Sequence, residues 1–263
     1  MNEHTPSRVG SPRLAVSAAV SDDNVLTTCL AASPDIESGA FELRTYRDYP
    51  SAAIALNDAL ESAEAEWVVL AHQDVYFPAR TLTRLEEMLD GLAEDVAVVG
   101  VIGRTPLGET VGEAWSSGMS KVVGVPLSEV SDAITLDEVV IIVRRASGVR
   151  FDPALPGFHL YATDIALMAD EAGMRVAVVP LTVVHHSRPV ISLGSDYAAA
   201  YRFLQRKWAA RLPVLTMMGD IRRFPLHLAR LDFRVRRASG FARTRRAPAG
   251  DPAEIARSLG LTP

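Results

Sequence analysis

The sequence is poor in cysteine and in long apolar runs. Cys29 is its single cysteine, which excludes an internal disulfide framework and favours a reducing compartment. No apolar run approaches the roughly 18 residues of a transmembrane helix, and residues 1–11 lack the apolar core of a signal peptide. We therefore expect a cytoplasmic protein whose residues 1–11 form a disordered lead-in.

Signatures of several enzyme classes are also missing. The sequence has no GxGxxG after its first predicted strand and no GxxxxGK[ST] phosphate loop. GxSxG, CxxC and HExxH are absent as well. These absences argue against a dinucleotide-dependent oxidoreductase, a P-loop kinase, a serine hydrolase and a zinc protease.

What is present predicts an α/β fold. The 263 residues are 48% hydrophobic and 22% charged, as in a soluble globular protein with a good core. Strand and helix patterns alternate in the first half: strands at 14–20, 41–46, 67–71 and 96–102, and helices at 51–65 and from 78 or 79 to about 91. This alternation predicts a mostly parallel sheet with helices on both faces.

The second half is less regular. Residues 103–135 are rich in Gly, Ser and Pro, which predicts a long functional or mobile loop. Further elements are expected as follows: strands at 139–144 and 176–184, the latter bent or at an edge because of Pro180, and helices at 158–172 and 197–211. We expect one domain at 12–212 and a basic helical extension with a tail at 213–263.

Arginines concentrate in that extension, although the net charge is −5. They are Arg222, Arg223, Arg230, Arg234, Arg236, Arg237, Arg243, Arg245 and Arg246. Such a segment can bind phosphate-bearing partners or an anionic membrane, or it is simply a solvated helix face. The apolar residues beside it, Phe224, Leu228, Leu231 and Val235, have helical spacing. They predict peripheral contact with the inner membrane face, or else packing on the rest of the protein or a dimer contact.

Polar groups follow the buried strand 67–71 directly, in the sequence HQDV. Ligands of open α/β sheets bind beyond the carboxyl ends of the strands, so residues 21–23, 72–74 and 103–104 are expected at one edge. Asp74 is suited to a divalent cation such as Mg²⁺ or Mn²⁺; the alternative is an Asx turn.

Other polar residues have two readings each. Asp164, at a helix start, is a general base or a carboxylate stabilised by the helix dipole. His185 and His186 point to opposite faces of a strand, so at most one enters a given site. Asn57 lies on an apolar helix face and needs partners, either backbone groups or a bound nucleotide.

Three more residues are candidate acceptor contacts. Asp137 and Glu138 precede a buried strand and either face an acceptor or are solvated. Trp115 either stacks on a sugar ring or fills a gap in the core.

The order of these pieces resembles a known family. SAAIALNDALESAEAEWVVLAHQDVYFP and FDPALPGFHLYATDIALMADEAGMRVAVVPLTVVHHS resemble two regions of family 2-like glycosyltransferases of the GT-A fold. HQDV, in place of a full Asp-x-Asp, is similar to the streptomycin-biosynthesis-type subgroup. The resemblance covers about residues 12–212.

The resemblance implies a role for each candidate residue. Asp74 would ligate Mn²⁺ or Mg²⁺ bridging a nucleotide diphosphate, with His185 or His186 completing the shell and His185 preferred. Asp164 would be the catalytic base, although Thr163 replaces its usual acidic neighbour. Implied donor contacts are Ser21, Asp22, Asn57, His72, Gln73 and Asp74. His72 departs from the family pattern, because it stands at the position of the first Asp. Implied acceptor contacts are Trp115, Asp137 and Glu138, with acceptor choice in 103–135.

The implied activity is an inverting transfer of a sugar from a UDP-, GDP- or dTDP-linked donor to an acceptor hydroxyl. The acceptor is left open, with a lipid-linked molecule or a glycan as candidates, and no nucleic-acid partner is expected. The loss of acidic residues at His72 and Thr163 keeps a second hypothesis open, a non-catalytic scaffold that binds a nucleotide sugar or a partner protein. Nucleotidyl transfer is a weaker third, because SDDNVL after the first strand is neither Gly-rich nor basic.

Overall fold

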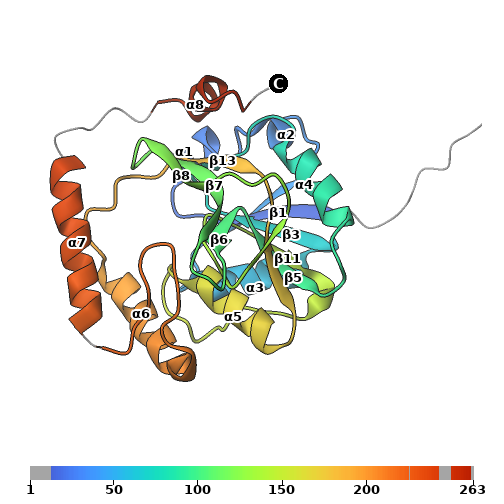
Figure 1. Ribbon diagram of the computed structural model, residues 1–263. Coiled ribbons are helices and arrows are strands. Elements are labelled where there is room, and N and C mark those ends of the chain that lie inside the picture. The colour runs from blue at the N-terminus through green and yellow to red at the C-terminus, as the bar shows by residue number, and fades with distance from the viewer. Residues whose placement is uncertain (1–12, 225, 243–249, 262–263) are drawn as a thin grey trace, which may run out of the picture.

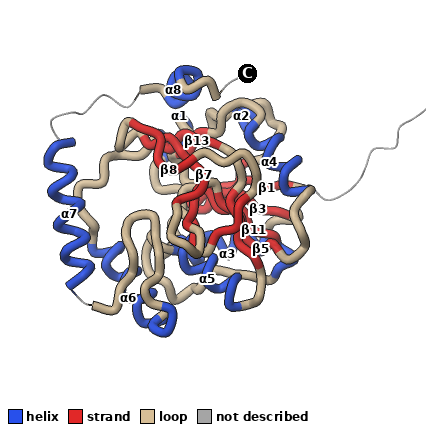
Figure 2. Tube along the Cα trace, in the orientation of Figure 1, coloured by secondary structure: helices blue, strands red, loops and turns tan. Residues whose placement is uncertain are grey.

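A computed structural model describes residues 13–224, 226–242 and 250–261 (Figure 1). The expected lead-in at 1–11 and the arginines Arg243, Arg245 and Arg246 fall outside the described residues. Strands form two sheets at the centre, and helices lie around them (Figure 2).

The larger sheet has seven strands in the order β2-β1-β3-β11-β5-β12-β9. Their bounds are β1 Leu14–Ala19, β2 Leu43–Tyr46, β3 Trp67–Ala71, β5 Val96–Gly100, β9 Ser131–Ala133, β11 Val140–Arg144 and β12 Arg175–Val178. β1 pairs parallel with β2 and β3, and β12 pairs parallel with β5. β11 runs antiparallel between β3 and β5, and β9 antiparallel to β12. Five of the seven strands therefore run in one direction, and the predicted α/β class with a mostly parallel sheet is confirmed.

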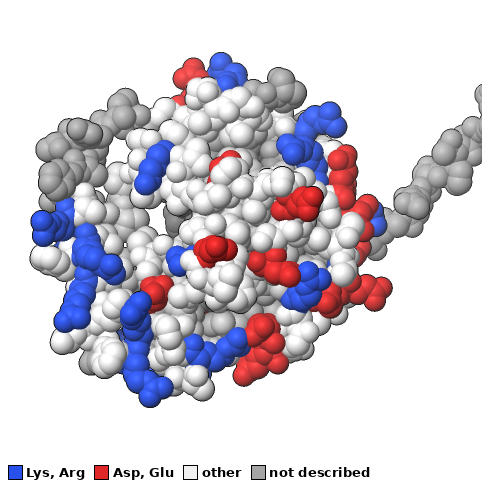
Figure 3. Space-filling model, in the orientation of Figure 1, with Lys and Arg blue, Asp and Glu red and all other residues white. Residues whose placement is uncertain are grey.

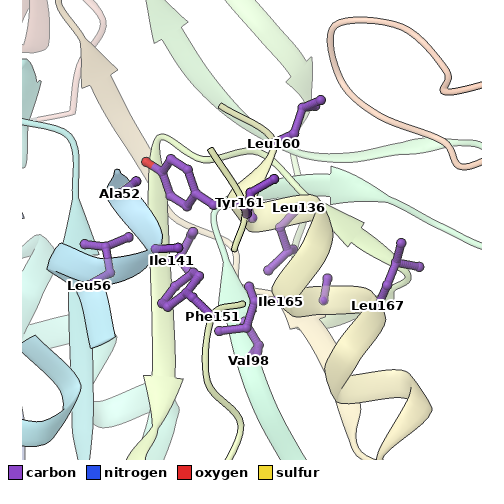
Figure 4. Packing of buried hydrophobic residues seen from close by; sticks show 14 of the residues in the cluster. Ala52, Leu56, Val98, Leu136, Ile141, Phe151, Leu160, Tyr161, Ile165 and Leu167 are labelled. Atoms are coloured by element: carbon purple, nitrogen blue, oxygen red, sulfur yellow. The ribbon is translucent and has the colours of Figure 1, made fainter. Parts of the chain in front are cut away.

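Helices cover both faces of this sheet. α3 (Ala52–Ser62) and α5 (Tyr161–Glu171) pack on one face, and α1 (Asp23–Thr28) and α4 (Thr81–Asp90) on the other. The short α2 (Pro34–Glu37) precedes β2. Alternate residues of β3 enter the two cores, Val68 and Leu70 on one side and the rest of the strand on the other. Period-two alternation between two buried faces explains why β3 reads as one unbroken apolar run. Figure 4 shows the core between α3, α5 and the sheet.

The smaller sheet corrects the prediction of a long loop at 103–135. Its order is β10-β6-β7-β13-β4, with β8 paired to β7. The bounds are β4 Val75–Tyr76, β6 Ile102–Arg104, β7 Thr110–Ser116, β8 Lys121–Val125, β10 Thr135–Leu136 and β13 Thr182–His185. A Cβ at Gly112 would lie 2.1 Å from the carbonyl oxygen of Val101, and one at Gly103 would lie 2.5 Å from that of Thr135. These glycines permit close strand approach rather than marking a loop.

The predicted strand at 176–184 is two strands in different sheets. β12 belongs to the larger sheet and β13 to the smaller one, with Pro180 between them. The expected bend at this proline is thus a change of sheet. The helix expected at 158–172 begins only at Tyr161, because Leu160 has a left-handed φ of 62°.

Three α-helices follow in the described residues: α6 (Ser195–Lys207), α7 (Leu226–Ala242) and α8 (Pro252–Ser258). α7 stands at one side of the molecule, and α8 lies beside β13 (Figure 1). The division expected at residue 212 stays a prediction, and the main core continues across it through Val214, Ile221 and Leu231. Leu228 and Val235 of α7 pack against that core as well. Three residues of the predicted apolar stripe, Leu228, Leu231 and Val235, therefore pack on the protein, as one of the alternatives expected, whereas Phe224 is exposed.

Candidate functional site

A cavity of about 470 Å³ lies at the carboxyl ends of β1, β2 and β3. The ends of β1 and β3, the loop 46–49 after β2 and the first turns of α3 line it, together with Phe158 and Tyr161. It is therefore at the sheet edge where ligands of open α/β folds bind, and its size is typical of small-molecule sites.

Three side chains meet beside this cavity: His72, Asp74 and His185. Their candidate ligand atoms all lie within 4.8 Å of one another. His185 Nε2 is 3.3 Å from Asp74 Oδ1, and His72 Nδ1 is 3.8 Å from the same oxygen. His72 and Asp74 follow β3 of the larger sheet, whereas His185 ends β13 of the smaller one, opposite Val75. The two sheets thus bring together residues more than 100 positions apart.

The three groups are electrostatically coupled. Burial would raise the pKa of Asp74, but its hydrogen bond to His185 and the nearby imidazoles lower it to about 2. Burial works against a charged His185, yet the Asp74 carboxylate raises the pKa of His185 overall. Burial lowers the pKa of His72. Asp74 is therefore ionised and the neutral form of His72 is favoured, as a metal ligand requires, whereas His185 would release a proton on binding a metal.

Tyr161 orients His72, and sequence reasoning missed this residue. Its hydroxyl oxygen is 2.7 Å from His72 Nε2 and donates to the carbonyl oxygen of Glu138 at 3.3 Å. A hydroxyl has one proton, so its oxygen accepts from Nε2–H of His72. This assignment leaves the Nδ1 lone pair of His72 facing Asp74. A hydrogen-bond partner on the other ring nitrogen, as Tyr161 provides here, is typical of metal-binding histidines.

His186, the alternative to His185, lies outside the cluster. Its Nδ1 is 3.2 Å from the hydroxyl of Ser117, on the other side of the strand. Gln73 lines the cavity, but its amide group is bonded within the protein. Its Oε1 accepts from the backbone N–H groups of Ser21 and Asp22 at 2.9 and 3.0 Å. Gln73 therefore holds the loop after β1, and Ser21 lines the cavity.

The contacts of three further candidates, Asp22, Asn57 and Trp115, favour structural roles. Asp22 is the N-cap of α1 and accepts from the backbone of Asn24. The amide nitrogen of Asn57 donates to the carbonyl oxygen of Phe151, and its amide oxygen accepts from the Phe151 N–H, both at 2.9 Å. Trp115 packs in a small cluster with Val184 and with Ala256 of α8, and it is not among the residues that line the cavity.

Asp164 does not line the cavity. Its exposed fraction is 1%, and its two oxygens accept from Trp208 Nε1 at 2.7 Å and from Lys207 Nζ at 2.8 Å. Lys207 also contacts Asp152 at 2.8 Å. Burial raises the pKa of Asp164. Tyr161 begins α5 and reaches the cavity, whereas Asp164, one turn later, packs against the end of α6. This placement does not fit a base that meets an acceptor.

A histidine–carboxylate pair, His159 and Glu138, lies just before the start of α5. His159 Nδ1 is 3.2 Å from Glu138 Oε1, and the other oxygen of Glu138 accepts from the Leu160 N–H at 2.6 Å. The hydrogen bond to Glu138 raises the pKa of His159, whose side chain is 44% exposed. Burial raises the pKa of Asp137, which accepts from the Val139 N–H. No motif or spacing in the sequence identifies His159 as a candidate site residue. In the chain it lies between two cavity residues, Phe158 and Tyr161.

No family model and no curated protein matches this chain. Similar solved structures include GalNAc-T7 with UDP, GalNAc and Mn²⁺, at 10% identity and a TM-score of 0.46, covering 80% of this chain and 53% of that one. The mannosyltransferase PcManGT from Pyrobaculum calidifontis, in complex with GDP-Man and Mn²⁺, is 15% identical, with a TM-score of 0.46, 98% of this chain and 82% of that one. S. aureus TarS 1-349 is also 15% identical with a TM-score of 0.46, and covers 88% and 73%. The chain thus spans about half the length of GalNAc-T7.

Proposed function

We propose that the protein is a metal-dependent glycosyltransferase that moves a sugar from a nucleotide-sugar donor to an acceptor hydroxyl. The observation that carries the proposal is the cluster of His72, Asp74 and His185 beside a cavity at the carboxyl ends of the parallel strands. The order of the sequence motifs supports it, because it resembles family 2-like GT-A enzymes. Membership of the streptomycin-type subgroup stays a prediction.

The donor atoms favour Mn²⁺ over Mg²⁺. Two imidazole nitrogens and one carboxylate oxygen form the cluster. Mg²⁺ strongly prefers an all-oxygen shell, whereas imidazole suits the transition metals. A divalent cation held here would neutralise negative charge on a departing diphosphate. The chain's own contribution is to fix the three ligands, with Tyr161 holding His72 in one tautomer.

The nucleotide is assigned to the part of the cavity between β1 and the loop 46–49. Tyr46 and Tyr49 line it with ring centroids 6.3 Å apart, which supplies aromatic surface for a base. The Asp48 carboxylate in the same loop can accept from ribose hydroxyls. This placement puts the diphosphate end of the donor toward Asp74.

We assign the acceptor's proton to His159 rather than Asp164. His159 is exposed, its Nδ1 is held by Glu138, and its Nε2 is directed away from that carboxylate. The acceptor oxygen would form a bond to the anomeric carbon as its proton passes to Nε2, and the bond to the diphosphate would break on the opposite face. The configuration at that carbon is then inverted.

A thermal-shift panel tests the donor class. The full chain would be titrated with UDP-, GDP- and dTDP-sugars with and without Mn²⁺, and release of the free nucleoside diphosphate would be followed in parallel. We expect one nucleotide to raise the Tm only when Mn²⁺ is present. Absence of any nucleotide-dependent shift would contradict the proposal.

A second candidate, a scaffold that binds a nucleotide sugar without turnover, is favoured by one observation. Both oxygens of Asp164, the base expected from the resemblance, are occupied by Lys207 and Trp208. Mn²⁺-dependent binding with no release of nucleoside diphosphate across donors and acceptors would select this candidate. A cytoplasmic location and a lipid-linked or glycan acceptor stay predictions.

A further inference from the structure

The outward face of α7 differs from the face predicted from sequence. Leu228, Leu231 and Val235 point inward to the core. Leu226 and Phe233 lie on the opposite side and are 66% and 63% exposed. Helical geometry places residues seven apart almost directly above one another. The helix is thus apolar on two opposite faces, and only one of them is covered.

Arginines flank the exposed apolar pair. Arg230 and Arg237, also seven apart, share the face of Leu226 and Phe233, and Arg234 lies next to it; all three arginines are exposed. Arg236, on the other edge, is ion-paired with Asp232. Within residues 13–224, 226–242 and 250–261, no ion pair involves Arg230, Arg234 or Arg237. Figure 3 shows basic side chains along this side of the molecule, whereas acidic ones gather on the other side.

We propose that this face of α7 docks on an anionic lipid surface. The guanidinium groups would contact lipid phosphates, and Leu226 and Phe233 would enter the boundary between headgroups and acyl chains. The inference is independent of the proposed activity, because none of these residues lines the cavity.

The chemistry favours a membrane over other anionic partners. A nucleic acid would use the arginines but leave large apolar side chains in water. A bilayer interface has anionic headgroups next to an apolar acyl region. An apolar helix face flanked by arginines is complementary to both. No helix among the described residues is long and apolar enough to cross a membrane. The contact would therefore be peripheral.

Flotation of the full chain with vesicles tests the proposal. Vesicles of phosphatidylcholine alone and of phosphatidylcholine with phosphatidylglycerol would be compared at low and high salt. We expect binding only to the anionic vesicles and weakening by salt. Arg230→Glu with Arg237→Glu should weaken it by at least about tenfold. Arg84→Glu with Lys121→Glu, on exposed parts of α4 and β8, changes the net charge equally and should leave binding within about twofold.

A second pair of variants tests the apolar contribution. Leu226→Ser with Phe233→Ser should weaken binding and make the remainder more sensitive to salt. Leu107→Ser, at a residue that is 86% exposed on the β6–β7 connection, should have no effect. Circular dichroism and Mn²⁺ titration would show that each variant is folded.

Three results would each overturn the proposal. The first is no binding of the wild-type chain to anionic vesicles. The second is equal loss in the α7 charge variant and in its control, which would indicate general charge attraction. The third is tight binding to duplex DNA that is unchanged in Leu226→Ser with Phe233→Ser, which would assign the face to a nucleic acid instead.

Discussion

The hydroxyl of Tyr161 joins two segments by lying 2.7 Å from His72 Nε2 and 3.3 Å from the Glu138 carbonyl oxygen. It connects the first turn of α5 to the loop after β3. The ring of Tyr161 is buried among the core residues beside α3 (Figure 4), and burial raises its pKa well above the ordinary value. The hydroxyl therefore stays protonated and fixes one orientation of His72.

Removing this hydroxyl tests its role in metal binding. Tyr161→Phe keeps the ring and its packing but leaves Nε2 of His72 without its partner. Loss of such a supporting contact typically weakens metal binding by 10–100-fold, so we expect a weakening of Mn²⁺ affinity of about tenfold by calorimetry. Tyr201→Phe, which removes a hydroxyl bonded to the Arg222 N–H, is the control. Equal Mn²⁺ affinity in all three proteins would contradict the assignment.

Two adjacent histidines give a matched test of the cluster. His185→Ala removes a candidate ligand, and Mn²⁺ affinity should fall by more than about tenfold, since a ligand matters at least as much as its supporting contact. His186→Ala, one residue later, removes a side chain bonded to Ser117. It should keep Mn²⁺ affinity within about twofold. If the two variants behaved alike, the cluster would not be the binding site.

Much of this arrangement could be predicted from sequence. The alternation of side chains along a strand separates His185 from His186 without any structure. The apolar run of β3 and the rule about carboxyl ends of strands place Asp74 at the ligand edge. Both arguments use one strand at a time, and local geometry is enough for them.

What could not be predicted depends on contacts between distant segments. Asp164 has the sequence context of a base, but Lys207 and Trp208, more than 40 residues later, occupy both its oxygens. In the sequence, Gly103 and Gly112 are typical of a loop. Only the position of the neighbouring backbone, at Thr135 and Val101, shows that these glycines allow two strands to approach closely. His159 becomes a candidate only when Glu138 is placed beside it.

The network around Asp164 predicts a stability effect. Asp164→Ala leaves Lys207 without one of its two carboxylate partners and Trp208 Nε1 without an acceptor. We expect a loss of about 3 kcal/mol in the free energy of unfolding, the usual cost of breaking a buried ion pair. The comparison is Asp170→Ala, on the same helix, whose exposed pair with Arg211 should cost less than about 1 kcal/mol. Urea unfolding measures both.

Turnover decides whether Asp164 has a second role. At a temperature where Asp164→Ala is folded, kcat per folded molecule should be close to that of the wild type. A loss of 100-fold or more, the usual contribution of a general base, would restore Asp164 as the proton acceptor.

Asn57 should contribute to stability rather than to donor binding. Asn57→Ala removes both hydrogen bonds to the Phe151 backbone. Leaving these groups unpaired should cost about 2 kcal/mol in the free energy of unfolding. Affinity for the nucleotide identified in the thermal-shift panel should stay within about threefold. A selective loss of nucleotide binding without loss of stability would show that Asn57 contacts the donor.

The assignment of His159 as proton acceptor predicts a particular pH dependence. A base must be neutral to take a proton, so kcat/KM should rise as the pH passes upward through the pKa of His159. The hydrogen bond to Glu138 raises that pKa above 6.5, and the acid limb of the wild-type profile should therefore lie above 6.5. Glu138→Gln removes the main cause of the rise while burial still lowers the pKa and Asp196 still raises it, so the limb should move to a lower pH than in the wild type.

The profile must be measured at saturating Mn²⁺, since protonation of His72 or His185 also weakens metal binding at low pH. His159→Ala, which should lower kcat by about 100-fold or more, shows whether the limb belongs to this residue. A limb that stays at one pH in wild type and Glu138→Gln would exclude the pair. If the limb moves and His159→Ala is inactive while still binding Mn²⁺ and nucleotide, the proton passes to His159, and the scaffold alternative is excluded by the same experiment.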